Sequence, residues 1–196
     1  MSLYSRNIYA PISAWVGLST LLGAADDDKI VESTNMVNGA YSIAAQPSVP
    51  SLLEVLQTAV GTADTSGTIT VVGRDSLGKE ITEVVVPVAG TKVYTTKYFS
   101  YFTSITGAGW VIASTNDTIK MGVLASGGVQ GVKGIPITIY PISGNIWIND
   151  RDVAVADATS LQLIAEVPIS FVPKTDVVSL ISDITGATFE VIIWDN

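Results

Sequence analysis

Residues 66–122 read SGTITVVGRDSLGKEITEVVVPVAGTKVYTTKYFSYFTSITGAGWVIASTNDTIKMG, and this stretch decides the fold. Apolar and polar residues alternate along most of it. Gly, Asp, Ser and Asn interrupt the alternation at intervals. A period of two is typical of half-buried strands, because successive side chains point to opposite faces of a sheet. The stretch therefore predicts a series of strands joined by short turns.

Two β-branched runs within this stretch predict a hairpin. Residues 68–72 read TITVV and residues 80–86 read EITEVVV, and the loop RDSLGK at 74–79 separates them. In that loop, Asp75 can accept hydrogen bonds from the backbone that follows it, and Gly78 can adopt a positive φ. Pro87 directly follows the second run, as expected for a strand at the protected edge of a sheet.

The rest of the chain has the same character, and no helical periodicity persists in it. Residues 52–60 are compatible with a short helix or a strand, and their β-rich surroundings favour a strand. The predicted fold class is all-β: a β-sandwich or jelly-roll-like domain, followed by a smaller β-module and preceded by an N-terminal arm.

Composition along the chain divides it into four parts. Residues 1–28 are predicted to form an N-terminal arm or a first strand, and residues 29–124 the β-sandwich domain. Residues 125–134 are predicted to be a Gly-rich linker, because four glycines in eight residues favour a flexible connection. Residues 135–196 form the predicted C-terminal β-module.

The chain has few charges for its size. Of its 196 residues, 47% are hydrophobic and 14% are charged, against roughly 25% charged in an average soluble domain. Interface cores are depleted in charge, so this composition favours a protein whose surface is covered by other subunits. A stable monomer with a Thr- and Ser-rich exterior is the alternative. We expect subunit contacts.

Several functional classes are disfavoured by composition. The net charge is −8 and the ten basic residues are scattered, which argues against direct binding to nucleic acid. The chain contains neither Cys nor His, which excludes disulfides, thiolate metal sites and Ser–His or Cys–His catalysis. No apolar run approaches the roughly 20 residues of a membrane-spanning helix. Residues 11–25 resemble the apolar part of a signal peptide, but Pro, Trp and hydroxyl residues interrupt them, so we do not expect a signal.

Aromatic residues are the candidates for ligand binding by stacking. Alternation over residues 98–102 places Tyr98, Ser100 and Phe102 on one face and the other two residues on the opposite face, so that one aromatic pair is expected in the core. The tryptophans and the polar residues in predicted loops complete a possible carbohydrate-binding set: Trp15, Trp110, Trp147, Trp194, Asn116, Asp117, Asn149, Asp150 and Asp152. Core or interface packing is the preferred interpretation of each Trp.

Acidic residues are the candidates for catalysis and for metal binding. Paired carboxylates can hydrolyse glycosides without His, and the candidates are Glu54, Glu83, Asp117 and Asp152. Solvated charges on strands are the preferred interpretation, so neither an enzyme nor any catalytic residue is expected. Residues 26–28 and 149–152 offer oxygens for Ca²⁺, but they lack the spaced ligands of a dedicated loop. No metal and no cofactor is expected.

An ordered series of short motifs gives the chain a resemblance. The motifs are 68–73 (TITVVG), 75–79 (DSLGK), 81–84 (ITEV), 95–99 (TTKYF), 103–106 (TSIT) and 116–122 (NDTIKMG). In this order they resemble a β-module common among virion structural proteins of tailed bacteriophages. Residues 135–196 resemble a second β-module of phage capsid-associated proteins, through 146–149 (IWIN), 167–171 (VPISF), 180–183 (LISD) and 191–194 (VIIW).

The resemblance implies a virion structural protein, most specifically a capsid decoration or cement protein that stabilises the head through subunit contacts. It implies the major capsid protein or other virion subunits as partners, a homo-oligomer for which we expect a trimer, and a location in the virion after assembly in the host cytoplasm. Neither nucleic acid nor membrane is an expected partner. Two alternatives stay open: a fibre module that binds a receptor or carbohydrate, and a head–tail connector or tail subunit.

Overall fold

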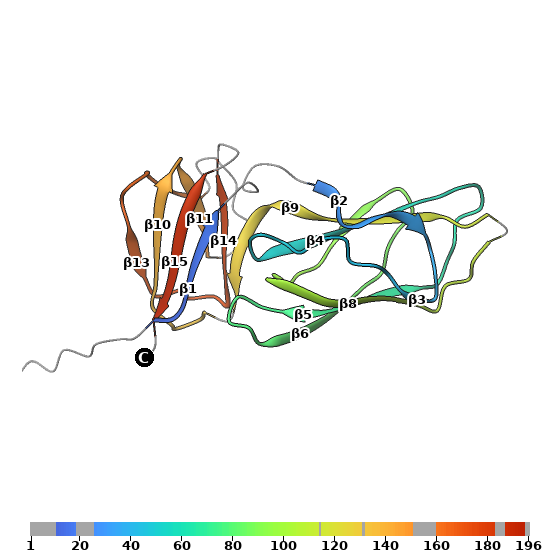
Figure 1. Ribbon diagram of the computed structural model, residues 1–196, viewed down its shortest axis with the longest axis horizontal. Coiled ribbons are helices and arrows are strands. Elements are labelled where there is room, and N and C mark those ends of the chain that lie inside the picture. Colours follow the sequence, from blue (N-terminus) through green and yellow to red (C-terminus); the bar gives the residue numbers. More distant parts are fainter. Residues whose placement is uncertain are drawn as a thin grey trace, which may run out of the picture.

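The computed structural model describes residues 11–18, 26–113, 115–130, 132–150, 160–182 and 187–194. These residues form strands, turns and extended segments and contain no helix, which confirms the all-β prediction. Figure 1 shows an elongated body with one β-unit at each end, which we call the first unit and the C-terminal unit. The jelly-roll part of the prediction stays a prediction.

Three antiparallel sheets build the body (Figure 1). The first has the order β3 (Gly39–Ala40), β8 (Tyr101–Ala108), β5 (Thr68–Arg74), β6 (Glu80–Val85). The second has the order β12 (Leu161–Leu163), β11 (Ile146–Asn149), β14 (Val177–Ser182), β9 (Thr118–Gln130), β4 (Ser51–Thr58), β7 (Lys92–Tyr94), with β2 (Asp26–Asn35) also paired to β9. The third has the order β1 (Pro11–Leu18), β15 (Thr188–Trp194), β10 (Ile137–Ser143), β13 (Ile169–Phe171).

Each unit contains its own hydrophobic core, and the alternation read from the sequence produces both. In β5, buried residues alternate with half-buried ones, and the buried Ile69 and Val71 pack in the first core. In β15, Phe189, Val191 and Ile193 alternate in the same way and pack in the second core. The two cores each lie between facing sheets, so the architecture is sandwich-like in both units.

One strand, β9, belongs to both units. Its residue Gly127 pairs with Ser51 of β4 and with Leu180 of β14. The structure therefore differs from the prediction of a flexible linker at 125–134, because residues 125–130 are strand. Gly128 serves close packing instead, because a Cβ at this position would lie 2.5 Å from the ring of Tyr98. The domain boundaries proposed from the sequence otherwise stay predictions.

Part of the predicted N-terminal arm is a strand of the C-terminal unit. β1 pairs antiparallel with β15, from Pro11 opposite Trp194 to Leu18 opposite Thr188. Residues 1–10 and 19–25 lie outside the described residues. The sheet of the C-terminal unit is thus built from both ends of the described chain.

The predicted hairpin is confirmed. β5 and β6 pair from Ile69 opposite Val85 to Arg74 opposite Glu80, and β6 is the edge strand of its sheet. In the loop, Asp75 Oδ1 accepts hydrogen bonds from the Leu77 N–H at 2.9 Å and the Lys79 N–H at 3.0 Å. Gly78 has a φ of 77°, which few other residues adopt without strain. Local turn chemistry therefore closes this hairpin.

We expect Asp75→Ala to lower the free energy of unfolding by about 1–2 kcal/mol, because it leaves two backbone donors of a tight loop without their acceptor. Asp75→Asn is the matched control, since its amide keeps the Oδ1 acceptor, and it should cost less than half as much. Urea denaturation of the three proteins measures the difference. Equal losses for Ala and Asn would mean that the carboxylate charge, and not the loop hydrogen bonds, stabilises the hairpin.

The structure of the aromatic segment 98–102 differs from one prediction. Strict alternation over 98–102 is wrong, because β8 begins only at Tyr101 and the preceding residues are not strand. Tyr98, Phe99 and Phe102 are all buried, and Tyr101 is exposed. Phe99 and Phe102 stack with ring centroids 5.2 Å apart, so most of the segment belongs to the core, as expected for structural aromatics.

Candidate functional site

A cluster of buried polar groups lies at the end of the first unit that is farther from the C-terminal unit. Gln57 is near the end of β4, Asp64 lies in the loop between β4 and β5, and Asp117 directly precedes β9. Asp117 Oδ2 accepts from Gln57 Nε2 at 2.6 Å and from the Asp64 N–H at 2.9 Å, and Asp117 Oδ1 accepts from the Val60 N–H at 2.9 Å. In return, Asp64 Oδ2 accepts from the Asp117 N–H at 3.0 Å.

We call this reciprocal arrangement the aspartate clasp. Burial by itself raises the pKa of Asp117, but hydrogen bonds from Gln57 and from the N–H groups of Val60 and Asp64 outweigh it and leave the pKa below its usual value. Asp64 Oδ1 also accepts from the Ala113 N–H at 2.6 Å. Both carboxylates therefore hold loops together, and Asp117, a candidate acid or base from the sequence, has a structural role in this geometry.

Glu54, the second candidate carboxylate, is 2% exposed on β4 and forms an ion pair with Lys92 of β7, with Oε1 and Nζ 2.7 Å apart. The two charged groups are in close contact, but Glu54 Oε1 accepts no hydrogen bond of good geometry. Glu54 raises the pKa of Lys92, which keeps the ammonium charged. Burial, together with the charge of Glu54, raises the pKa of the neighbouring Tyr94, which keeps its phenol neutral.

Glu83, the third candidate, is not a solvated strand charge as predicted. It lies on the same face of the hairpin as the core residue Val85 and is half-buried. Its carboxylate accepts from the Thr96 N–H at 2.7 Å, the Thr96 hydroxyl at 3.0 Å and the Lys97 N–H at 3.0 Å. An inward charge on an edge strand discourages uncontrolled strand pairing, and here it also ties β6 to the loop after β7.

The candidate carboxylates Glu54, Glu83 and Asp117 do not converge on one another in the described part of the chain. Glu54, Glu83 and Asp117 each have a separate set of partners, and Asp152 lies outside the described residues. Asp27, from the Asp26–Asp28 segment, forms an ion pair with Lys120, and the Lys120 ammonium lowers the pKa of Asp27. Among the described residues, no group of three or more acidic side chains is arranged to hold a metal ion.

The tryptophans lie mostly in the interior. Trp110 and Trp147 are buried, and Trp194 is half-buried and donates its indole N–H to the Thr138 hydroxyl at 2.9 Å. The side chain of Trp15 lies outside the described residues. The Asn38 side chain fixes the backbone of Trp110: its Nδ2 donates to the Trp110 carbonyl at 3.0 Å, and its Oδ1 accepts from the Trp110 backbone N–H at 2.8 Å. Trp110 and Trp147 are therefore core residues and do not offer stacking faces.

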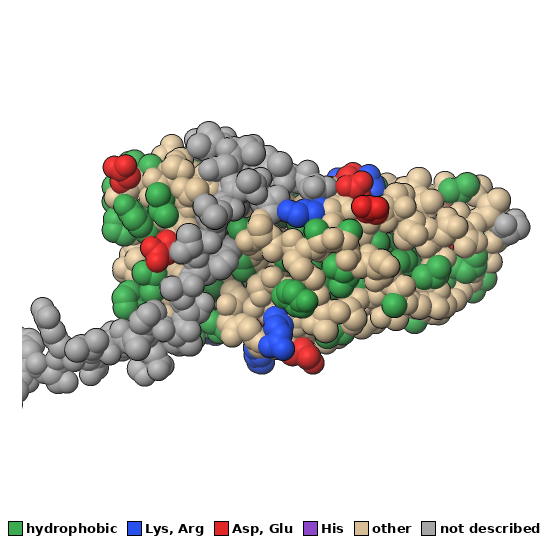
Figure 2. All heavy atoms as spheres, in the orientation of Figure 1, with side chains coloured by type: hydrophobic (Ala, Val, Ile, Leu, Met, Phe, Trp, Pro, Cys, Tyr) green, Lys and Arg blue, Asp and Glu red, His purple; other side chains and the backbone are tan. Residues whose placement is uncertain are grey.

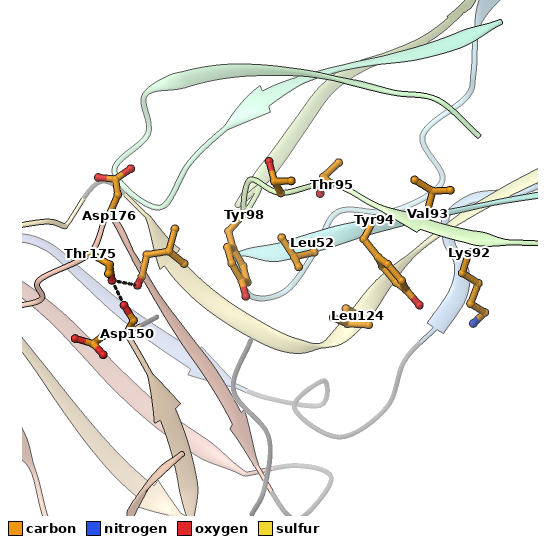
Figure 3. A pocket seen from close by; sticks show the side chains of 12 residues that line it. Leu52, Lys92, Val93, Tyr94, Thr95, Tyr98, Leu124, Asp150, Thr175 and Asp176 are labelled. Carbon is orange, nitrogen blue, oxygen red and sulfur yellow. Dashed lines mark hydrogen bonds between the residues drawn. The ribbon is translucent and has the colours of Figure 1, made fainter. Parts of the chain in front are cut away.

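A groove of about 880 Å³ lies between the two units (Figure 3). Leu52, Tyr94, Tyr98 and Leu124 contribute its apolar wall from the first unit. On the side of the C-terminal unit, the Thr175 hydroxyl donates to the carbonyls of Asp150 and Val177. This groove is an apolar recess, and the Thr175 hydroxyl at its border already has partners within the chain.

The aspartate clasp underlies a surface that the sequence-based candidates missed. We call it the tip: the loops 58–67, 84–91 and 107–113. Its exposed hydrophobic residues are Val60 (46% exposed), Val84 (56%), Val86 (59%), Val88 (52%) and Val111 (62%). Beside them is a hollow of about 460 Å³, lined in part by Val86, Val88 and Trp110. The sequence feature that could have indicated this surface is its lack of charge, because Asp64 is the only charged residue in these three segments.

Comparisons with protein-family models, with curated proteins and with solved structures gave no match. Among the described residues, no helix has the length and apolar character needed to cross a membrane.

Proposed function

We propose that this chain is a structural subunit that binds other protein subunits through apolar surfaces of its two β-units. In its most specific form, the proposal is a decoration protein on the head of a tailed bacteriophage, in contact with the major capsid protein or other virion subunits. The low charge content of the chain and its resemblance to phage β-modules support that form.

The observation on which the proposal depends is the distribution of exposed apolar side chains. One group is the tip of the first unit. The other belongs to the C-terminal unit and consists of Ile142, Leu161, Ile164 and Val167, while Val172 is exposed at the opposite end of β10, next to the Phe171–Ile137 pair. The Glu166 N–H donates to the Pro141 carbonyl at 2.7 Å, which brings the turn containing Ile164 and Val167 next to the end of β10. Exposed apolar groups of this kind are typical of protein contact surfaces.

The path of the chain suits a mechanical role. β9 pairs with β4 in the first unit and with β14 in the C-terminal unit, so hydrogen-bonded sheet connects the two. A sheet that continues from one unit to the other resists bending more than a flexible linker does. A contact at one end is then held at a fixed position relative to a contact at the other end, as a protein that braces a shell requires.

The exposed side chains give less support to the two alternatives, a carbohydrate-binding fibre module and a connector or tail subunit. A carbohydrate-binding fibre module needs exposed stacking faces, whereas Trp110 and Trp147 are buried. A connector or tail subunit would use the same apolar surfaces and differs only in its location on the particle. A location in the virion is therefore part of the proposal. The copy number of the chain in the particle distinguishes a decoration protein from a connector or tail subunit.

Quantitative mass spectrometry of purified virus particles from the biological source of this chain tests the proposal. A decoration protein is expected at a copy number comparable to that of the major capsid protein. A copy number of about a dozen or fewer would favour a connector or tail subunit. Absence from particles, while the chain is present in the lysate, would contradict a virion function.

A further inference from the structure

The tip presents no exposed charge, although the whole chain has a net charge of −8. The only charged residue in its loops, Asp64, is buried, and so is Asp117 beside it. Their carboxylates are occupied by N–H donors of the aspartate clasp. In Figure 2 the right-hand end of the molecule carries neither acidic nor basic side chains on the visible face, while charged groups gather near the middle and at the left.

The same surface contains both projections and a recess. Val60 and Val111 are exposed on the loops of the tip, and Val86 and Val88 border its hollow. The Val111 N–H donates to the Thr65 carbonyl at 2.9 Å, which fixes Val111 next to Thr65, another residue lining the hollow. A surface with adjacent projections and a recess can fit a rotated copy of itself, which is what a symmetric interface requires.

From these observations we infer that the tip binds the tip of a second copy of this chain. Two acidic copies repel each other wherever their carboxylates meet, and this repulsion acts over roughly 8–10 Å at physiological salt. The tip avoids that repulsion. The apolar surface of the C-terminal unit does not, because the exposed Glu166 lies between Ile164 and Val167. That surface is therefore assigned to a different partner.

The inference deepens the proposed function, on which it rests, because it names the surface through which copies of the subunit contact one another. Sedimentation velocity over a concentration series tests it. Wild type is expected to shift from monomer to a closed oligomer as its concentration rises. Val88→Asp/Val111→Asp should weaken that association about a hundredfold, because it places like charges opposite each other. Val167→Asp, an equally exposed valine in the C-terminal unit, is the matched control and should associate like wild type.

Circular dichroism of each variant verifies that the strands are retained. Salt provides a second measurement with a defined sign, since added NaCl screens repulsion between acidic copies and should strengthen an apolar contact. A wild type that stays monomeric at every concentration, or association lost only in Val167→Asp, would overturn the inference. If particles incorporate the chain as isolated monomers, the proposed function stands and only the tip contact is refuted.

Discussion

Asp117→Asn is expected to lower the free energy of unfolding by about 3 kcal/mol at pH 7. The carboxylate accepts three hydrogen bonds, from Gln57 Nε2 and from the N–H groups of Val60 and Asp64. An amide in its place offers one oxygen and turns an NH₂ group toward at least one of those donors. A buried donor left without an acceptor costs about 1–3 kcal/mol, and more where the lost acceptor is charged. The loss should also loosen the tip, since the clasp connects its loops.

The same substitution should change the response to acid. The pKa of Asp117 in the folded protein lies below the ordinary value of 3.8. The carboxylate therefore contributes stability that is fully present above the ordinary pKa and is lost as the pH falls through the folded pKa. Wild type should lose more stability than Asp117→Asn between pH 5 and the low end of the measurable range.

Urea denaturation at several pH values measures both effects. Asp176→Asn is the control, because the Asp176 side chain is exposed. If Asp117→Asn behaves like this control at pH 7, the clasp is not a stabilising element and the account of the tip is wrong.

Gly67→Ala should destabilise the protein by a similar amount, about 3 kcal/mol. A Cβ at Gly67 would lie 1.9 Å from Cδ2 and 2.3 Å from Cε2 of Trp110. Trp110 cannot move away easily, because Asn38 holds its backbone on both sides and its ring belongs to the first core. Overpacking in a fixed site costs typically 1–3 kcal/mol, and a contact this short belongs at the upper end.

Two further variants make this prediction specific. A Cβ at Gly39 would meet no atom within 4 Å, so Gly39→Ala should change stability by less than about 0.5 kcal/mol. Gly67→Ala combined with Trp110→Leu should be less destabilising than the sum of the two single changes, because the smaller side chain removes the clash. Strict additivity in thermal or urea denaturation would show that the contact with Trp110 is not the cause.

Features encoded by neighbouring residues were predictable from the sequence. The hairpin of β5 and β6 follows from alternation and from the chemistry of Asp75 and Gly78, and all of these signals lie within 20 residues of one another. The pairing of β1 with β15 was not predictable, because residues 11–18 carry no local signal for a partner at 188–194. The glycines at 127 and 128 indicated flexibility by composition, but pairing on both sides makes them part of a strand.

The candidate site shows the same limit. Glu54, Glu83 and Asp117 were recognisable as acidic residues in strands or turns. Their partners are distant in sequence, as with Asp64 and Asp117, whose contact spans 53 positions. One sequence cannot indicate which carboxylates are buried and satisfied. The absence of charge in three loops was visible in the sequence, but only the fold brings those loops together as the tip.

We propose that this chain braces an assembly through apolar contacts at the ends of its β-body, and a cryo-EM map of the intact particle is the decisive experiment. We expect an elongated two-unit density at many equivalent positions, with the C-terminal unit on a neighbouring subunit and tips of adjacent copies in contact. A fully occupied particle map in which no density fits this body, or in which both ends face solvent, would contradict it.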